Sequence, residues 1–340
     1  MSKRRFTPLA LAAAATALVA GAVAGSGDAR PAQDTIKAGL VSDVGRFNDK
    51  GFNQFQLEGL QRAKKQLKVE TRAIESRSAS DYIPNLTSLA RQQYNIVISA
   101  GFLLADATNK VAKRFPDTTF AITDYTAFAP PFSGKQKNVV GLTYAANENS
   151  YVIGCLAALV TKPQGGKRTI SVVGGVKIPP VDIFLAGYRA GAKKCVPNVK
   201  VLIGYSQDFI AQDKCKEIAL NQIAAGSQVV FNVAGPCGLG ALDAAKEKKV
   251  WGIGVDKDQS FLGKHILTSA VKRVDQGIFL AIKAVQDDEV EGGKDLVFNL
   301  KNAGVSVGKI SRGVPARHIA RMNALKRQII AGKIKVPTKV

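Results

Sequence analysis

Short apolar runs alternate with amphipathic segments of helical length along almost the whole chain after residue 36. Strands that alternate with helices predict parallel sheets covered by helices on both faces. Because 340 residues exceed one ordinary compact domain, we expect two lobes, each with its own sheet. The expected strands are residues 36–40, 96–100, 119–122, 170–173, 199–204, 229–233, 250–255 and 267–271, with short strand-like pieces after residue 297. The expected helices are residues 52–67, 105–115, 147–160, 183–195, 212–225, 239–248, 275–285 and 316–330.

The first 24 residues have the plan of a secretory signal peptide. Residues 3–5 are all Lys or Arg, an Ala-rich apolar segment follows, and small side chains occupy residues 22–24. A membrane anchor is the alternative, but the segment contains Pro8 and few large apolar side chains. We therefore expect an exported protein that is periplasmic or at the cell surface, and peripheral to the membrane.

All four cysteines, Cys155, Cys195, Cys215 and Cys237, lie in the part expected to be exported. An even number in an oxidising compartment predicts one or two disulfides, with three connectivities open for two bridges. Buried free thiols are the alternative. We favour Cys215–Cys237, because both lie at the start of adjacent strand–helix units. The cysteine spacing matches no metal site and the chain has only two histidines, so no metal is expected.

The formal charge of +22 is unevenly distributed, because nine basic residues and no acidic one lie in residues 309–340. Such an excess usually indicates nucleic-acid binding. Elsewhere the basic residues are scattered along helices, as at 62–65 and 246–249, which is typical of solvated faces. For an exported chain we expect no nucleic acid. An anionic membrane or wall surface that meets the basic C-terminal region is the expected partner.

Residues 43–54, DVGRFNDKGFNQ, follow an expected strand and lead into an expected helix. This places them at the carboxyl edge of a sheet, where open α/β sheets bind ligands. Acids, amides and two aromatic rings within a dozen residues favour a small polar ligand with a flat ring.

Gly-containing loops follow other expected strands, at residues 99–102, 173–176 and 233–240. The last of these lacks both the ending of a P-loop and the spacing of a dinucleotide fingerprint, so we expect no cofactor. Neither histidine is placed for a nucleophile–base set, and the acids are dispersed. The loops therefore indicate a ligand cleft, and a non-enzymatic role.

Short motifs follow one another along nearly the whole chain after residue 42: DVG and NDK–FNQ within 43–54, ITD at 122–124, NENSYVIG at 147–154, FLAGYRAG at 184–191, VAG and GLG within 233–240, GVDKDQ at 254–259 and LTSAVKRVD at 267–275. In these motifs the chain resembles the basic membrane protein family, whose members are substrate-binding receptors of ABC importers related to purine-nucleoside receptors. The resemblance implies a type I periplasmic-binding-protein-like clamshell, with two α/β lobes, each a parallel sheet flanked by helices, joined by three hinge crossings. We assign residues 36–145 plus 258–286 to the N-terminal lobe and residues 146–257 plus 287–340 to the C-terminal lobe.

The resemblance implies that a purine ring stacks on Phe52 and on an aromatic side chain of the other lobe. Phe209, in an expected loop, and Phe184 are the candidates, although the helical neighbours of Phe184 favour a core role. Asp43 and Asp124 end apolar strands and are expected to accept hydrogen bonds from ring N–H groups. Capping of a helix or a hinge hydrogen bond is the alternative role for both.

Two amides, Asn48 and Asn53, are expected to contact ring or sugar groups, the alternative being turn closure. Asp256 and Lys272 resemble a sugar-binding pair, and a salt bridge across the hinge is the other interpretation. Gly235 lets the backbone approach the ligand.

One residue departs from the family pattern. Arg46 stands where the family usually has a second glycine, and it either points to solvent or changes which ligand fits.

These features predict an extracytoplasmic receptor that binds a purine nucleoside and delivers it to an ABC permease. The alternatives are a ligand-sensing domain for a membrane signalling partner and an exported nucleoside-processing enzyme.

Overall fold

The computed structural model describes residues 35–340, so the expected signal peptide lies outside the described residues. The strands are β1 (Lys37–Ser42), β2 (Glu70–Ile74), β3 (Ile96–Ala100), β4 (Thr119–Thr123), β5 (Val139–Tyr144), β6 (Thr169–Gly174), β7 (Lys200–Tyr205), β8 (Val229–Val233), β9 (Trp251–Asp256), β10 (Ile266–Lys272), β11 (Asp295–Phe298) and β12 (Val305–Val307). The α-helices are α1 (Phe52–Leu67), α2 (Tyr82–Arg91), α3 (Ala105–Ala112), α4 (Ala146–Val160), α5 (Pro179–Cys195), α6 (Gln212–Ala224), α7 (Gly238–Glu247), α8 (Val274–Gln286) and α9 (Ala316–Ile330).

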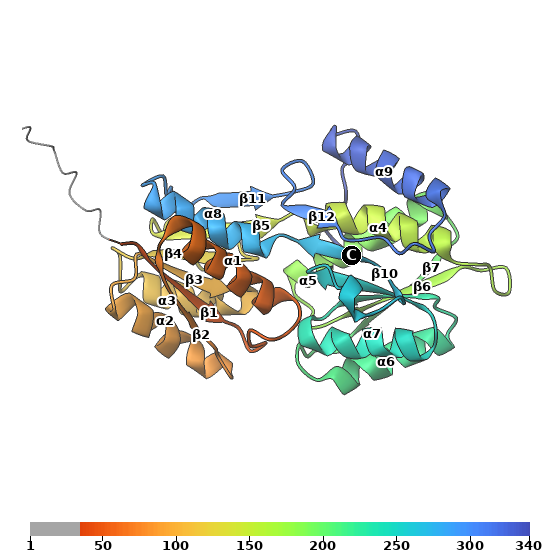
Figure 1. Ribbon diagram of the computed structural model, residues 1–340, viewed down its shortest axis with the longest axis horizontal. Coiled ribbons are helices and arrows are strands. Elements are labelled where there is room, and N and C mark those ends of the chain that lie inside the picture. The colour runs from red at the N-terminus through yellow and green to blue at the C-terminus, as the bar shows by residue number, and fades with distance from the viewer. Residues whose placement is uncertain (1–34) are drawn as a thin grey trace, which may run out of the picture. The chain divides into compact units, whose positions relative to one another are not determined.

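The strands form two six-stranded sheets (Figure 1). The first sheet has the order β11-β5-β4-β3-β1-β2, and all of its strand pairs are parallel. The second has the order β12-β10-β9-β8-β6-β7 and is parallel except for the β10–β12 pair. Every residue of β3, β8 and β10 is buried, as expected for strands covered on both faces.

Helices cover both faces of each sheet (Figure 1). In the first lobe, α2 and α3 share one apolar cluster with Val41 and Val97, whereas α1 and α8 pack together on the face that carries Leu40 and Ile98. In the second lobe, α6 and α7 cover one face, α4 and α5 cover the other, and α9 packs on α4. The expected α/β class is confirmed.

The chain crosses between the lobes three times, as expected for the clamshell. The crossings join β5 to α4, β10 to α8, and β11 to β12. Two of the expected lobe boundaries are wrong. β10 lies in the second sheet although residues 258–286 were assigned to the first lobe, and β11 lies in the first sheet although residues 287–340 were assigned to the second. An apolar run predicts a strand, but its neighbours in the sheet depend on non-local packing.

Three elements of the first lobe, β2, α2 and β5, were not expected. β2 is an edge strand with mostly exposed polar side chains, so it lacks the apolar run of the central strands. The Pro-rich stretch 127–134 is a loop between β4 and β5 in the first lobe, anchored by the buried ring of Phe132.

Two disulfides lie in the second lobe. Cys215 of α6 is bonded to Cys237, the last residue of a short 3₁₀ helix, η3 (Gly235–Cys237). Cys155 of α4 is bonded to Cys195 at the end of α5. No helix within residues 35–340 is both long enough and apolar enough to cross a bilayer.

Candidate functional site

A cavity that is partly open to solvent lies where the carboxyl ends of the strands of both lobes meet, and the empty space at this place, open solvent included, is about 610 Å³. This is the position at which parallel sheets present ligand-binding loops. Nine of the ten residues that the sequence singled out for binding line it. They are Asp43, Phe52, Asn53, Asp124, Phe184, Phe209, Gly235, Asp256 and Lys272.

The remaining expected residue, Asn48, is exposed and does not line this cavity. Arg46 is also exposed and is not among the lining residues. Its backbone has a φ of 51°, in the left-handed region that glycine adopts at a lower energetic cost than arginine. Both side chains are exposed members of the loop between β1 and α1, in which exposed and buried residues alternate.

Asp49 organises the start of α1. Its Oδ1 accepts hydrogen bonds from the amides of Gly51 and Gln54, at 2.9 and 3.0 Å, and its Oδ2 accepts one from the amide of Asn53 at 2.8 Å. First-turn amides have no partner within a helix, so this carboxylate supplies one. The helix therefore begins at Phe52, and the ring of Phe52 lies at the cavity.

Asp43 is held by its neighbours in the same loop. Its Oδ1 accepts hydrogen bonds from the amide of Gly45 at 2.8 Å and from Asn53 Nδ2 at 2.7 Å. Burial raises the pKa of Asp43 to about 6, and the two hydrogen bonds only partly oppose this. Asn53 Oδ1 is buried and has no hydrogen-bond partner within residues 35–340, so it is free to accept one from a ligand.

Lys272 connects the two lobes inside the cavity. Its Nζ lies 2.7 Å from Asp124 Oδ2, after β4 of the first lobe, and 3.1 Å from Asp256 Oδ1, at the end of β9 of the second. All three side chains are less than 10% exposed. Burial lowers the pKa of Lys272, but the two carboxylates more than offset this, so the net shift is upward and the ammonium stays charged. Burial raises the pKa of Asp124, and Lys272 opposes that shift.

Of the two expectations for Asp256 and Lys272, the salt bridge across the hinge is therefore the one that matches the contacts of Lys272. The two aspartates share a further property, because both have a φ near +60° (62° for Asp124 and 61° for Asp256). Left-handed backbone is uncommon for residues other than glycine and clusters at binding sites.

Aromatic rings from both lobes contribute to the cavity. Lys272 Nζ lies 4.6 Å from the centroid of the Phe52 ring and 5.3 Å from that of Phe184. Phe184 is only 2% exposed and packs edge-on against Phe231, so it belongs to the core as well as lining the cavity. Phe209 is half-buried in the loop before α6. The two rings available for stacking from opposite lobes are thus Phe52 and Phe209.

Asp49 and Phe102 are among the lining residues that sequence reasoning missed. Asp49 stands three positions before an expected helix start, which is a capping signal, but capping does not reveal that the carboxylate also faces a cavity. Phe102 ends one of the Gly-containing loops noted above, so its position was predictable from the strand–loop pattern. No group of three or more His, Cys, Asp or Glu side chains within residues 35–340 is arranged to hold a metal ion.

Comparisons with known proteins agree with this architecture. Residues 36–339 match the family model described as ABC transporter substrate-binding protein PnrA-like. The ABC transporter nucleoside-binding protein BmpA of Lactococcus lactis subsp. cremoris is 35% identical over 100% of both chains. Basic membrane protein A1 of Borrelia garinii subsp. bavariensis is 31% identical over 88% of each chain.

A solved structure, that of an ABC transporter system solute-binding protein from Aeropyrum pernix K1, superposes with a TM-score of 0.81 at 24% identity. The match covers 89% of this chain and 93% of that one, so the fold is shared over both lobes. Together with the family match, this means that the chain belongs to the PnrA-like family of ABC transporter substrate-binding proteins.

Proposed function

We propose that this chain is an extracytoplasmic receptor that binds a purine nucleoside in the cavity between its lobes and delivers it to an ABC importer. The observation that carries the proposal is the composition of the cavity. Two aromatic rings, Phe52 and Phe209, come from different lobes, and beside them lies the charged set of Lys272, Asp124 and Asp256. A relative that is 35% identical bears the name nucleoside-binding protein, which supports the same ligand class.

The base end of the ligand lies between the two rings in this proposal. Flat heterocycles stack well on phenylalanine, and stacking tolerates different ring substituents. Asp43 and Asn53 offer acceptors that are already fixed by hydrogen bonds to the loop. An acceptor held in place discriminates strongly for ring N–H and amino groups, because a ligand without them leaves the acceptor unpaired.

The ribose end lies at Asp256 and Lys272. A carboxylate accepts hydrogen bonds from two neighbouring hydroxyls, and an ammonium donates to the same oxygens. The carboxylates Asp43, Asp49, Asp124 and Asp256 line the cavity against a single ammonium, that of Lys272. A phosphate group would meet this excess of negative charge, so nucleosides are expected to bind much better than nucleotides.

The decisive experiment is mass spectrometry of the small molecules that copurify with the protein, followed by calorimetry with nucleosides, bases, sugars and nucleotides. A purine nucleoside is expected to bind and to raise the melting temperature, because it binds only the folded state. Binding of sugars or peptides in place of nucleosides would refute the ligand assignment.

A conservative variant tests the two ends of the site separately. Asp256→Asn is expected to weaken binding of ribonucleosides far more than binding of the free bases. Equal losses for both would show that Asp256 does not contact the sugar.

We further propose that the basic C-terminal region contacts an anionic lipid or wall surface. Eight of its nine Lys and Arg residues are exposed, and no ion pair within residues 35–340 involves any of the nine. Uncompensated cations near an anionic surface each contribute about 1 kcal/mol. Cosedimentation with anionic vesicles or isolated wall material is expected at low salt, and to weaken in Arg317→Glu/Arg321→Glu. Unchanged binding by that variant would refute the contact.

A further inference from the structure

The second lobe builds its side of the cavity from two loops that lie far apart in the sequence. The first, residues 206–211 between β7 and α6, carries Phe209. The second, residues 234–237 after β8, consists of Ala234 and η3, and its Gly235 lines the same cavity. The 206–211 loop has no helix or strand of its own, so the position of Phe209 depends on what fastens this loop to the segment after β8.

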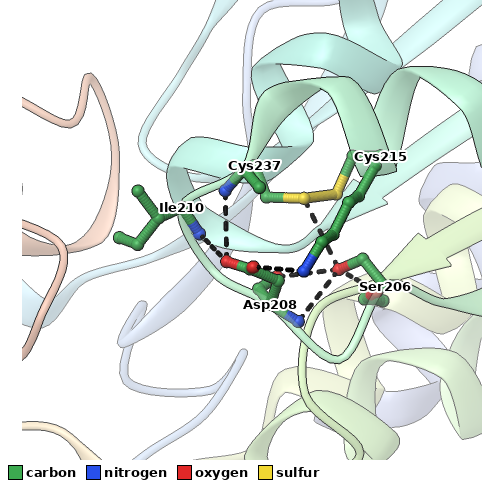
Figure 2. A network of polar contacts seen from close by, with 8 residues as sticks. Ser206, Asp208, Ile210, Cys215 and Cys237 are labelled. Carbon is green, nitrogen blue, oxygen red and sulfur yellow. Dashed lines mark hydrogen bonds and ion pairs between the residues drawn. A yellow bond between two sulfur atoms is a disulfide. The ribbon is translucent and has the colours of Figure 1, made fainter.

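Residue Cys237 fastens the two loops in two ways (Figure 2). Its backbone amide donates a hydrogen bond of 2.8 Å to the carbonyl oxygen of Phe209. Its side chain forms the disulfide with Cys215, in the first turn of α6, and the two Cα atoms are 5.6 Å apart. Ser206 Oγ lies 3.4 Å from Cys237 Sγ, which brings the start of the 206–211 loop to the same point.

The 206–211 loop is also closed by Asp208 (Figure 2). Its Oδ1 accepts hydrogen bonds from the amides of Ile210 at 2.7 Å and Ala211 at 3.1 Å. Its Oδ2 lies 2.8 Å from Lys214 Nζ. These contacts shape the loop itself, but they do not join it to η3. The loop is joined to η3 by the hydrogen bond from the Cys237 amide and by the contact between Ser206 Oγ and Cys237 Sγ, and the disulfide joins η3 to α6, the helix that the loop leads into.

The ring of Phe209 has little freedom on the side of β6. A Cβ atom built at Gly175 would lie 2.4 Å from a carbon of this ring, far inside van der Waals contact. The ring is therefore packed directly against the backbone after β6, and a small shift of the loop would either bring it into collision or open a gap. Sub-ångström positioning of this kind controls how well a stacking surface complements a ligand.

We propose that the Cys215–Cys237 disulfide is a positioning element of the ligand site, which holds the backbone of Phe209 where its ring stacks on the base. The proposal rests on the proposed function for the identity of the ligand. Without the covalent link, only hydrogen bonds would hold the backbone of Phe209 in place, and the part of the ordering that is then left to ligand binding would appear as lost affinity.

The second disulfide offers a matched control. Cys155–Cys195 is in the same lobe and joins α4 to α5, and neither cysteine lines the cavity. It closes a longer stretch of chain, with a sequence separation of 40 against 22 for Cys215–Cys237. The chain-entropy account therefore predicts at least as large a loss of stability from the control as from the test pair. If the affinity falls more when Cys215–Cys237 is removed than when Cys155–Cys195 is removed, the difference then comes from a local effect on the site and not from lower overall stability.

The experiment compares Cys215→Ala/Cys237→Ala with Cys155→Ala/Cys195→Ala in the full chain. Calorimetry with inosine and adenosine is expected to show affinity reduced on the order of tenfold for the first pair and less than about twofold for the second. In a Phe209→Ala background, removing the Cys215–Cys237 link is expected to have little further effect, because its target is gone. Equal losses for the two pairs, or full additivity with Phe209→Ala, would overturn the proposal.

A second measurement does not depend on the ligand. Hydrogen exchange at the amides of Ile210, Ala211 and Cys237 is expected to accelerate in Cys215→Ala/Cys237→Ala and to stay unchanged in the control pair. If the wild-type protein binds no nucleoside, the proposed function fails, and exchange still decides whether the disulfide holds the loop. Unchanged exchange in both variants would refute the positioning role.

Discussion

The first lobe holds its side of the cavity with hydrogen bonds inside residues 43–54, whereas the second lobe holds the loop of Phe209 beside a covalent bond between α6 and η3. In the first lobe, Asp49 caps α1 and thereby places Phe52, and Asn53 fixes Asp43. In the second, Cys215 and Cys237 are 22 residues apart in sequence. Local polar contacts are broken by single substitutions at a cost of about 1 kcal/mol each. Loss of a covalent link between segments that are distant in sequence instead leaves a whole segment free to move.

The ion-paired set of Lys272, Asp124 and Asp256 differs from both of these arrangements, because it joins the two lobes to each other. Lys272→Ala leaves two buried carboxylates without their cation, which typically costs about 3–5 kcal/mol. We expect urea unfolding to show a loss of this size, together with loss of ligand binding.

A second ion pair between the lobes provides the control for Lys272. Lys257 and Glu58 also pair across the lobes, but their side chains are 25% and 38% exposed. Exposed pairs contribute less than about 1 kcal/mol, so Lys257→Ala should change stability little. Similar losses for Lys257→Ala and Lys272→Ala would mean that burial is not what makes the Lys272 set important.

Asp43, on the first lobe's side of the cavity, should make the stability of the protein depend on pH. Its pKa in the folded state is about 6, above the value of 3.8 for an unperturbed Asp. The folded state therefore keeps a proton that the unfolded state has lost, and wild-type stability falls relative to Asp43→Asn as the pH rises from 4 to about 6. The difference should reach about 2 kcal/mol, since one pKa unit corresponds to ~1.4 kcal/mol and the carboxyl group is only partly buried. Urea titrations between pH 4 and 7 measure it, and a wild type that gains stability over this range would contradict the assignment.

Capping by Asp49 is the next largest expected effect. Asp49→Ala removes three amide partners at the start of α1 and should cost about 1–2 kcal/mol in the free energy of unfolding. It should also weaken ligand binding, because Phe52 is the first residue of that helix. Asp81→Ala is the control, since Asp81 accepts hydrogen bonds from the amides of Arg77 and Ser78 and does not line the cavity. Thermal unfolding and calorimetry should separate the two variants, and equal loss of binding in both would contradict the role of Asp49.

The same contrast explains what the sequence could reveal about the site. The loop at 43–54 could be interpreted directly, because strand, cap and helix start follow one another within a dozen residues. Phe209 could be proposed only from a resemblance and its loop position, since nothing near it in sequence indicates Gly175 or η3. The lobe assignments of β10 and β11 were wrong for the same reason, because packing between distant segments decides which strands pair in a sheet.

The variant with the smallest expected effect tests the position of Phe209 in the second lobe and leaves the disulfide intact. Gly175→Ala places a methyl group against the ring of Phe209, and crowding of this kind costs about 1 kcal/mol or more. Because the disulfide prevents the loop from retreating, we expect the ring to tilt and nucleoside affinity to fall about threefold, with a small loss of stability. In Phe209→Ala the added methyl group meets no ring, so Gly175→Ala should then leave affinity unchanged. A loss of affinity in both backgrounds would mean that Gly175 acts on the ligand directly and not through Phe209.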